Sequence, residues 1–208
     1  MVKKVMKEKD ALEKARYLYE DISKTSHLSI KKIYNKLRGD YPKVSWRRLI
    51  CSNSGYPKWI FRLQLTALER PYTRDRLSKW GVITKLIYPL CDNDDESIEH
   101  LFFKCHLSAA LWDKMLTWMK INRGPMGWNQ ELAWIVTNAN AKDTKAGIYR
   151  LTMTGCVYYL WHERNLRIFQ KKSRSVEVLS RLITQGVHCR GHWDRKLAGQ
   201  LRRMNFFP

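Results

Sequence analysis

The chain has 208 residues, of which 44% are hydrophobic and 28% are charged, a composition that supports a folded core and excludes a wholly disordered protein. No apolar run is long enough to cross a bilayer, and the basic N-terminus lacks the apolar block of a secretory signal. We therefore expect an intracellular protein, nuclear or cytoplasmic, without membrane contact. The 39 Lys and Arg residues outnumber 19 Asp and Glu by 20, and this excess favours a polyanionic partner, usually nucleic acid.

The positive charge is concentrated at the two ends of the chain. Residues 1–60 hold 15 Lys and Arg against 6 Asp and Glu, and residues 148–208 hold 12 against 3. Residues 61–147 are nearly balanced, with 12 against 10. We expect phosphate contacts from the ends, although solvated helix faces would give the same charge pattern.

In chain order, apolar spacing and helix-boundary residues predict helices over 10–22, 30–37, Pro57 to about Leu68, Arg74–Trp80, Leu107–Ile121, Trp128–Val136, 148–170 and 176–187. Pro42 begins a stretch through Gly55 that we expect to be irregular. Thr73 is expected to cap the helix that follows it.

Residues 82–105 are the compositional exception. Val82 to Ile87 is typical of a short extended segment, and the acidic run from Asp92 to Glu96 is typical of a solvated loop. Ser97 is placed to cap the next turn. The sequence thus predicts a mainly α, multi-helix domain with a small irregular or β-containing insert that resembles a zinc knuckle.

Three residues of this insert have metal-binding chemistry. His100 and Cys105 form H-x4-C, the second half of a zinc knuckle, and Cys91 is near enough along the chain to join them on one Zn²⁺ ion. A complete first half, C-x2-C, would need a second cysteine at position 88, where the chain has Tyr88. His106 could be the fourth ligand, but adjacent residues rarely converge on one tetrahedral ion.

The run from Glu96 to Cys105, ESIEHLFFKC, followed by Trp112, resembles the reverse-transcriptase zinc-binding domain, which lies C-terminal to the polymerase in plant LINE-type retrotransposons. Further similarities, spread over about residues 29–190, lie at Pro57–Trp59, at Leu65 and Thr73–Leu77, at Trp80–Gly81, and at Val157–Asn165 with Ile168–Phe169. Tyr72 stands where this family usually has Leu.

The resemblance implies a domain over 29–140, with its knuckle at 88–105, between a basic N-terminal extension at 1–28 and a basic helical region at 141–208. It also implies zinc on Cys91, His100 and Cys105, and a role in holding template RNA or target DNA. Because Tyr88 replaces one ligand, two interpretations stay open: an open site with water as the fourth ligand, or a knuckle that folds without metal.

The C-terminal third supplies the candidate nucleic-acid contacts. Arg164, Arg167 and Lys171 follow helical spacing and are expected to share one face opposite Trp161. The remaining candidates are Lys172, Arg174, Arg190, Arg195 and Lys196. Phe102 or Phe103 could stack on an unpaired base, and most of the tryptophans are expected in the core.

No P-loop, nucleophile elbow or H-E-x-x-H motif is present, so we expect a protein that is not an enzyme and takes no small-molecule substrate. The favoured hypothesis is a non-catalytic nucleic-acid-binding module derived from a retrotransposon polyprotein. The alternative is a decayed or co-opted helical domain that binds proteins.

Overall fold

The computed structural model describes residues 31, 34–35, 42–88, 91, 94–139 and 141–204. The chain divides into two compact units, Met1–Val44 and Ser45–Pro208. In the first unit, Lys31, Tyr34 and Asn35 are helical, in agreement with the helix predicted over 30–37. The helix predicted over 10–22 and the extension 1–28 lie outside the described residues.

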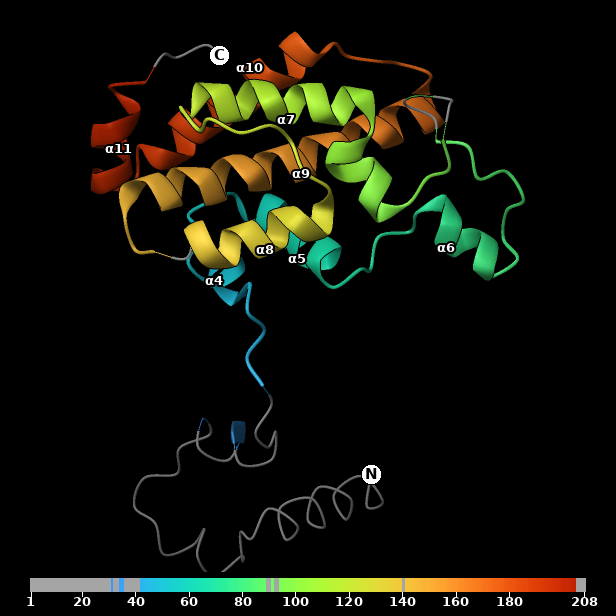
Figure 1. Ribbon diagram of the computed structural model, residues 1–208, viewed down its shortest axis with the longest axis horizontal. Coiled ribbons are helices and arrows are strands. Elements are labelled where there is room, and N and C mark those ends of the chain that lie inside the picture. Colours follow the sequence, from blue (N-terminus) through green and yellow to red (C-terminus); the bar gives the residue numbers. More distant parts are fainter. Residues whose placement is uncertain are drawn as a thin grey trace, which may run out of the picture. The chain divides into compact units, whose positions relative to one another are not determined.

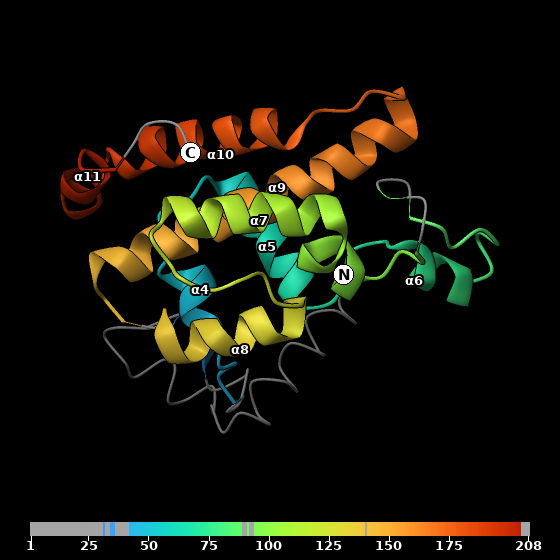
Figure 2. The ribbon, with the colours of Figure 1, turned by 45° about the horizontal axis from the view of Figure 1, so that its top comes forward.

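The second unit is a bundle of α-helices, which confirms the mainly α prediction. Its longest helix, α9 (Thr144–Gln170), runs through the middle of the unit and packs against α5 (Pro57–Ala67) and α10 (Val176–Gly191) (Figures 1 and 2). The other elements are α4 (Arg47–Cys51), α6 (Arg74–Lys79), the wide turn η1 (His100–Lys104), α7 (His106–Trp118), α8 (Trp128–Asn138) and α11 (Arg195–Leu201).

Local sequence signals explain most of the helix starts. Pro57 occupies the first turn of α5, and Asp143 caps α9 by accepting a hydrogen bond from the backbone N–H of Ala146 at 2.7 Å. Ser175 caps α10 in the same way through Val178. Thr73 stands at the cap position of α6, but its buried hydroxyl makes no capping hydrogen bond, contrary to expectation.

Two helices were not predicted. The stretch from Pro42 to Gly55, expected to be irregular, contains α4. This helix has only five residues and no capping side chain, so the sequence carries no signal for its start. The helix α11 does have such a signal, because Asp194 accepts from the backbone N–H groups of Lys196 and Leu197. Its apolar spacing is harder to recognise, because basic residues stand at and after its start.

The helices α9, α10 and α11 share one compact unit with α4–α8. The boundary expected between residues 140 and 141 therefore falls inside this unit. The helices before and after that point are held together because α9 contacts both α5 and α10. Within the described residues, no helix combines the length and the apolar character that a membrane span requires.

A tryptophan fixes the contact between α5, α9 and α10. The Trp59 side chain is 1% exposed, and its ring lies against Gly155 of α9 and Gly186 of α10. A Cβ atom at position 155 would lie 3.0 Å from the indole, and one at position 186 would overlap it. The two glycines thus let the helices approach the ring closely.

The predicted insert contains a small β element. Ile87 and Asp95 form an isolated antiparallel bridge, and the backbone N–H of Tyr88 donates to the carbonyl of Asp94 at 2.8 Å. The N–H of Glu96 donates to the carbonyl of Leu86, also at 2.8 Å. These bonds hold residues 86–88 beside residues 94–96 and set the start of the segment that leads to His100.

Gly186→Ala is expected to destabilise the fold by about 1–3 kcal/mol, because the added methyl group would collide with the Trp59 ring. Urea unfolding followed by circular dichroism measures this loss. Gly199→Ala in α11 is the matched control, since no heavy atom lies within 4 Å of the added Cβ. Equal stabilities of the two variants would show that Trp59 does not set the spacing of the helices.

Candidate zinc site and basic surface

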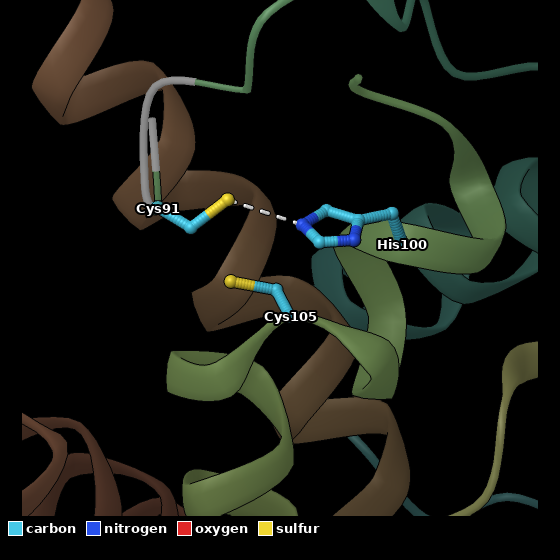
Figure 3. Close-up of side chains that lie close together, drawn as sticks. All are labelled: Cys91, His100 and Cys105. Carbon is cyan, nitrogen blue, oxygen red and sulfur yellow. Dashed lines mark hydrogen bonds between the residues drawn. The ribbon is translucent and has the colours of Figure 1, made fainter. Parts of the chain in front are cut away.

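Cys91, His100 and Cys105 converge in the structure, as the sequence predicted. One donor atom from each residue lies within 4.8 Å of the other two, and Cys91 Sγ lies 3.2 Å from His100 Nε2 (Figure 3). Figure 3 shows both thiols and the imidazole directed toward a common centre. His106, by contrast, is exposed and is not part of this cluster.

The loop between His100 and Cys105 is rigidly shaped. The backbone N–H of Cys105 donates to the carbonyl of His100 at 2.9 Å, which closes the loop. Phe103 has φ of +80°, a left-handed conformation that costs energy for a residue with a Cβ. Its ring offsets that cost by stacking on Trp112, with centroids 4.9 Å apart. The sharp turn at Phe103 directs Cys105 back toward His100.

Hydrogen bonds hold the rest of the loop. The N–H of Phe103 donates to the hydroxyl of Ser108, which itself donates to the carbonyl of Cys105. Ser97 accepts from the backbone N–H of His100 at 3.1 Å, as expected for a cap. Protein contacts therefore help to hold His100 and Cys105 in position.

Tyr88 lies beside the cluster. Its side chain is 0% exposed, and its ring meets that of His100 edge to face, with centroids 5.3 Å apart. The N–H of Cys91 donates to the carbonyl of Tyr88, so residues 88 and 91 are joined by a tight turn of the kind found in C-x2-C. Burial raises the pKa of the Tyr88 phenol well above its usual value, and within the described residues its hydroxyl has no hydrogen-bond partner.

The protonation states of the cluster suit a metal site. Burial lowers the pKa of His100, which favours the neutral imidazole that binds metal. The other ring nitrogen, Nδ1, lies 3.8 Å from a carboxylate oxygen of Asp94, the partner that commonly orients a histidine ligand. Burial also raises the pKa of Cys105, so binding of a metal there must displace a proton.

The donor set fits zinc. Two thiols and one imidazole nitrogen are among the ligands that Zn²⁺ prefers, and their donor atoms lie close to one another. Asp94 and Asp95 are exposed, as expected for a solvated loop. Glu96 is not: its side chain is 0% exposed, which corrects the expectation that the whole acidic run lies in solvent.

The geometry agrees with a family comparison. Residues 28–112 match the family described as zinc-binding in reverse transcriptase. This segment is similar to the reverse-transcriptase zinc-binding domain. The match includes Tyr88 and all three candidate ligands and ends at Trp112. Two further comparisons gave no match to a curated protein or to a solved structure.

The segment that leads to the Cys and His cluster is tied to α9 by a buried ion pair. The guanidinium of Arg164 donates to Glu96 Oε1 from Nη2 at 2.8 Å and from Nε at 3.0 Å. Arg74 adds a weaker contact at 3.8 Å. Burial raises the pKa of Glu96, and Arg164 and then Arg74 oppose this effect. The Arg164 side chain is only 7% exposed. Contrary to the prediction, it therefore does not share an open face with Arg167 and Lys171.

The basic residues near the end of α9 divide into two kinds. The side chains of Arg167 and Arg174 both form ion pairs with Glu163, at 3.0 and 2.9 Å. Lys171 and Lys172 are exposed, and Lys171 ends the helix in a left-handed conformation. Two lysines thus project at this end of the bundle beside two arginines that an internal carboxylate holds in place.

The remaining candidates lie on α10 and α11. Arg190 donates from Nε to the carbonyl of Ser54 at 2.8 Å, and its guanidinium lies 5.9 Å from the centre of the Tyr56 ring. This arginine therefore joins α10 to the segment before α5. Arg195 and Lys196 are exposed on α11, at the opposite end of the bundle from Lys171.

The structure changes the set of candidate stacking residues. Phe102 and Phe103 are 0% and 2% exposed, so neither offers a face to an unpaired base, contrary to expectation. Trp193, Phe169 and Trp80 are instead 85%, 76% and 55% exposed. The sequence does contain a signal for Trp193, because it is an isolated aromatic residue in a basic stretch, but apolar spacing alone does not reveal it.

Arg164→Met is expected to cost about 3–5 kcal/mol of stability, because it leaves the Glu96 carboxylate buried without its main partner. The loss should be largest in the insert, so Cys105 should become more reactive toward an alkylating reagent than Cys156, which lies in the middle of α9. Mass spectrometry of alkylated peptides measures both rates. Arg181→Met, at an exposed position, is the control, and equal protection of Cys105 and Cys156 in Arg164→Met would contradict the role of the ion pair.

Proposed function

We propose that this protein is a non-catalytic nucleic-acid-binding module of a retrotransposon reverse transcriptase, acting in the nucleus or cytoplasm. The observation that carries the proposal is the end of α9, where exposed Lys171 and Lys172 lie near the exposed ring of Phe169. Cations close to a free aromatic face suit single-stranded nucleic acid, which offers phosphates and unpaired bases together.

The distribution of carboxylates supports the same function. Glu96, Glu131 and Glu163 are each 0% exposed, and each binds at least one arginine inside the fold. Glu131 accepts hydrogen bonds from three side chains: the Arg123 guanidinium, the Trp112 indole and the Tyr149 hydroxyl. These carboxylates are turned away from solvent, so they do not repel an approaching phosphate strand. The net charge of +20 supplies the long-range attraction.

Zinc has a structural role in this proposal. Cys91, His100 and Cys105 would hold the ion, which would join the turn at Tyr88–Cys91 to the loop at His100–Cys105. We infer that Tyr88 occupies a position at which a cysteine would complete the tetrahedron. The ion would stabilise the insert, whereas the lysines and exposed aromatic rings would contact nucleic acid.

Lys171→Gln combined with Lys172→Gln is expected to weaken binding to a single-stranded RNA. The slope of log K against log salt should also become shallower, by about 0.7 for each phosphate that the variant no longer neutralises. Fluorescence anisotropy at several salt concentrations measures both effects. Lys142→Gln with Lys145→Gln, which removes two exposed lysines near the other end of α9, should change affinity less. Salt-independent binding by the native protein, or no binding, would instead support a protein-interaction domain.

Tyr88→Cys is expected to bind Zn²⁺ at least roughly tenfold more tightly than the native chain, because a third thiolate would close the tetrahedral site. Competition with a chromophoric chelator measures both affinities. Tyr88→Phe, which keeps the ring and removes the hydroxyl, should bind zinc as the native protein does. Equal affinities of the native chain and Tyr88→Cys would show that residue 88 is not at a ligand position.

A further inference from the structure

A groove of about 600 Å³ lies between α5, α6 and α9, away from the Cys and His cluster. Its described lining combines arginines with aromatic rings and includes no carboxylate, the main contributors being Arg62, Arg70, Arg76, Tyr72, Trp80 and Trp161. An anionic occupant with planar groups matches both features.

Two aromatic side chains of the groove, Tyr72 and Trp80, are exposed to solvent. Tyr72 is 62% exposed and Trp80 is 55% exposed, and their rings meet edge to face with centroids 5.7 Å apart. More than half of each side chain is thus open to solvent, and covering this apolar surface would be favourable. A base from an unpaired nucleotide could cover one of them.

The arginines are positioned by ring faces and leave their hydrogen bonding free. Arg62 lies over Trp161 at 4.6 Å from the ring centre, and Arg76 lies over Trp80 at 5.4 Å. Within the described residues, neither of these arginines nor Arg70 forms an ion pair with a carboxylate. A guanidinium that stacks on a ring keeps its N–H groups for a phosphate.

The backbone that carries the groove is anchored to the core. Arg164 Nη2 donates to the carbonyl of Tyr72 at 3.3 Å, and the N–H of Asp75 donates to the carbonyl of Glu96 at 3.2 Å. The ion pair that ties the insert to α9 therefore also holds the start of α6. This support makes the groove part of the folded domain, with its rings preorganised.

A neighbouring hollow helps to define how the groove is used. Trp80, Arg70 and Arg76 also line a second, open hollow, but that one includes the carboxylates of Glu69, Asp75 and Glu99. There Arg70, Arg76 and Lys79 face an equal number of carboxylates, so a phosphate strand would be attracted less strongly than on the side of Tyr72. Because only the groove lacks carboxylates, it is the more favourable of the two for a phosphate strand.

We propose that the groove between α5, α6 and α9 binds single-stranded nucleic acid, with one base stacked on Trp80 and the adjoining phosphates held by Arg62, Arg70 and Arg76. This inference rests on the proposed nucleic-acid binding and adds to it a second contact surface, which only an unpaired strand can use. A duplex keeps its bases stacked on one another, so it can use the lysines at the end of α9 but not the ring of Trp80.

Trp80→Ala tests the groove, with single-stranded and double-stranded RNA of equal length as the probes. Affinity for the single strand should fall roughly tenfold or more, while affinity for the duplex should change little. Because the ring carries no charge, the salt dependence should stay as in the native protein. Trp80→Phe should retain most of the single-strand affinity, since it restores a stacking surface.

Phe61→Ala is the matched control, because Phe61 is an exposed aromatic residue of α5, at 59%, outside the lining of the groove. Unchanged single-strand affinity in Trp80→Ala, or an equal loss on duplex RNA, would overturn the groove while leaving the proposed function intact. Native protein that binds neither probe would overturn both. Circular dichroism of each variant separates loss of binding from loss of fold.

Discussion

The ion pair between Glu96 and Arg164 is the contact on which the functional regions of this protein depend. It joins residues 68 positions apart in the chain, at the end of the acidic run and in the second half of α9. Burying a carboxylate is costly unless a cation and hydrogen bonds replace the lost water, and Arg164 provides two donors to one oxygen. A buried pair of this kind contributes little net stability compared with an apolar contact, so its effect here is to select one arrangement of the insert on α9.

The ion pair positions the backbone on both sides of Glu96. Toward the C-terminus, Glu96 is followed by the Ser97 cap and then by the loop that brings His100 and Cys105 together. Toward the N-terminus, the carbonyl of Glu96 and the guanidinium of Arg164 hold the backbone at Asp75 and Tyr72, where α6 begins. The candidate zinc site and the arginine-lined groove are thus built on one shared anchor, although their chemistry differs. A change at the anchor should disturb both, whereas a change at Trp80 or Cys91 should disturb one.

The sequence was sufficient to predict features that depend on near neighbours. Pro57 and the apolar spacing around it located α5, and H-x4-C located the donors that the structure brings together. Features that depend on distant residues could not be predicted in this way. Helical spacing places Arg164 near Arg167, but whether its guanidinium meets solvent or a carboxylate depends on Glu96, far away in sequence. Phe102 and Phe103 were misjudged for the same reason, because it is Trp112 and Trp128 that cover their rings.

Contacts within the protein also explain how the insert that carries Cys91, His100 and Cys105 keeps its shape. In a small knuckle that lacks a core, the metal supplies most of the folding energy, so loss of a ligand unfolds the motif. Here the loop is closed by backbone hydrogen bonds, the turn at Phe103 is covered by two tryptophans, and Tyr88 fills the space beside His100. The buried Tyr88 ring adds apolar surface to this packing. Contacts within the fold therefore help to hold Cys91, His100 and Cys105 close together.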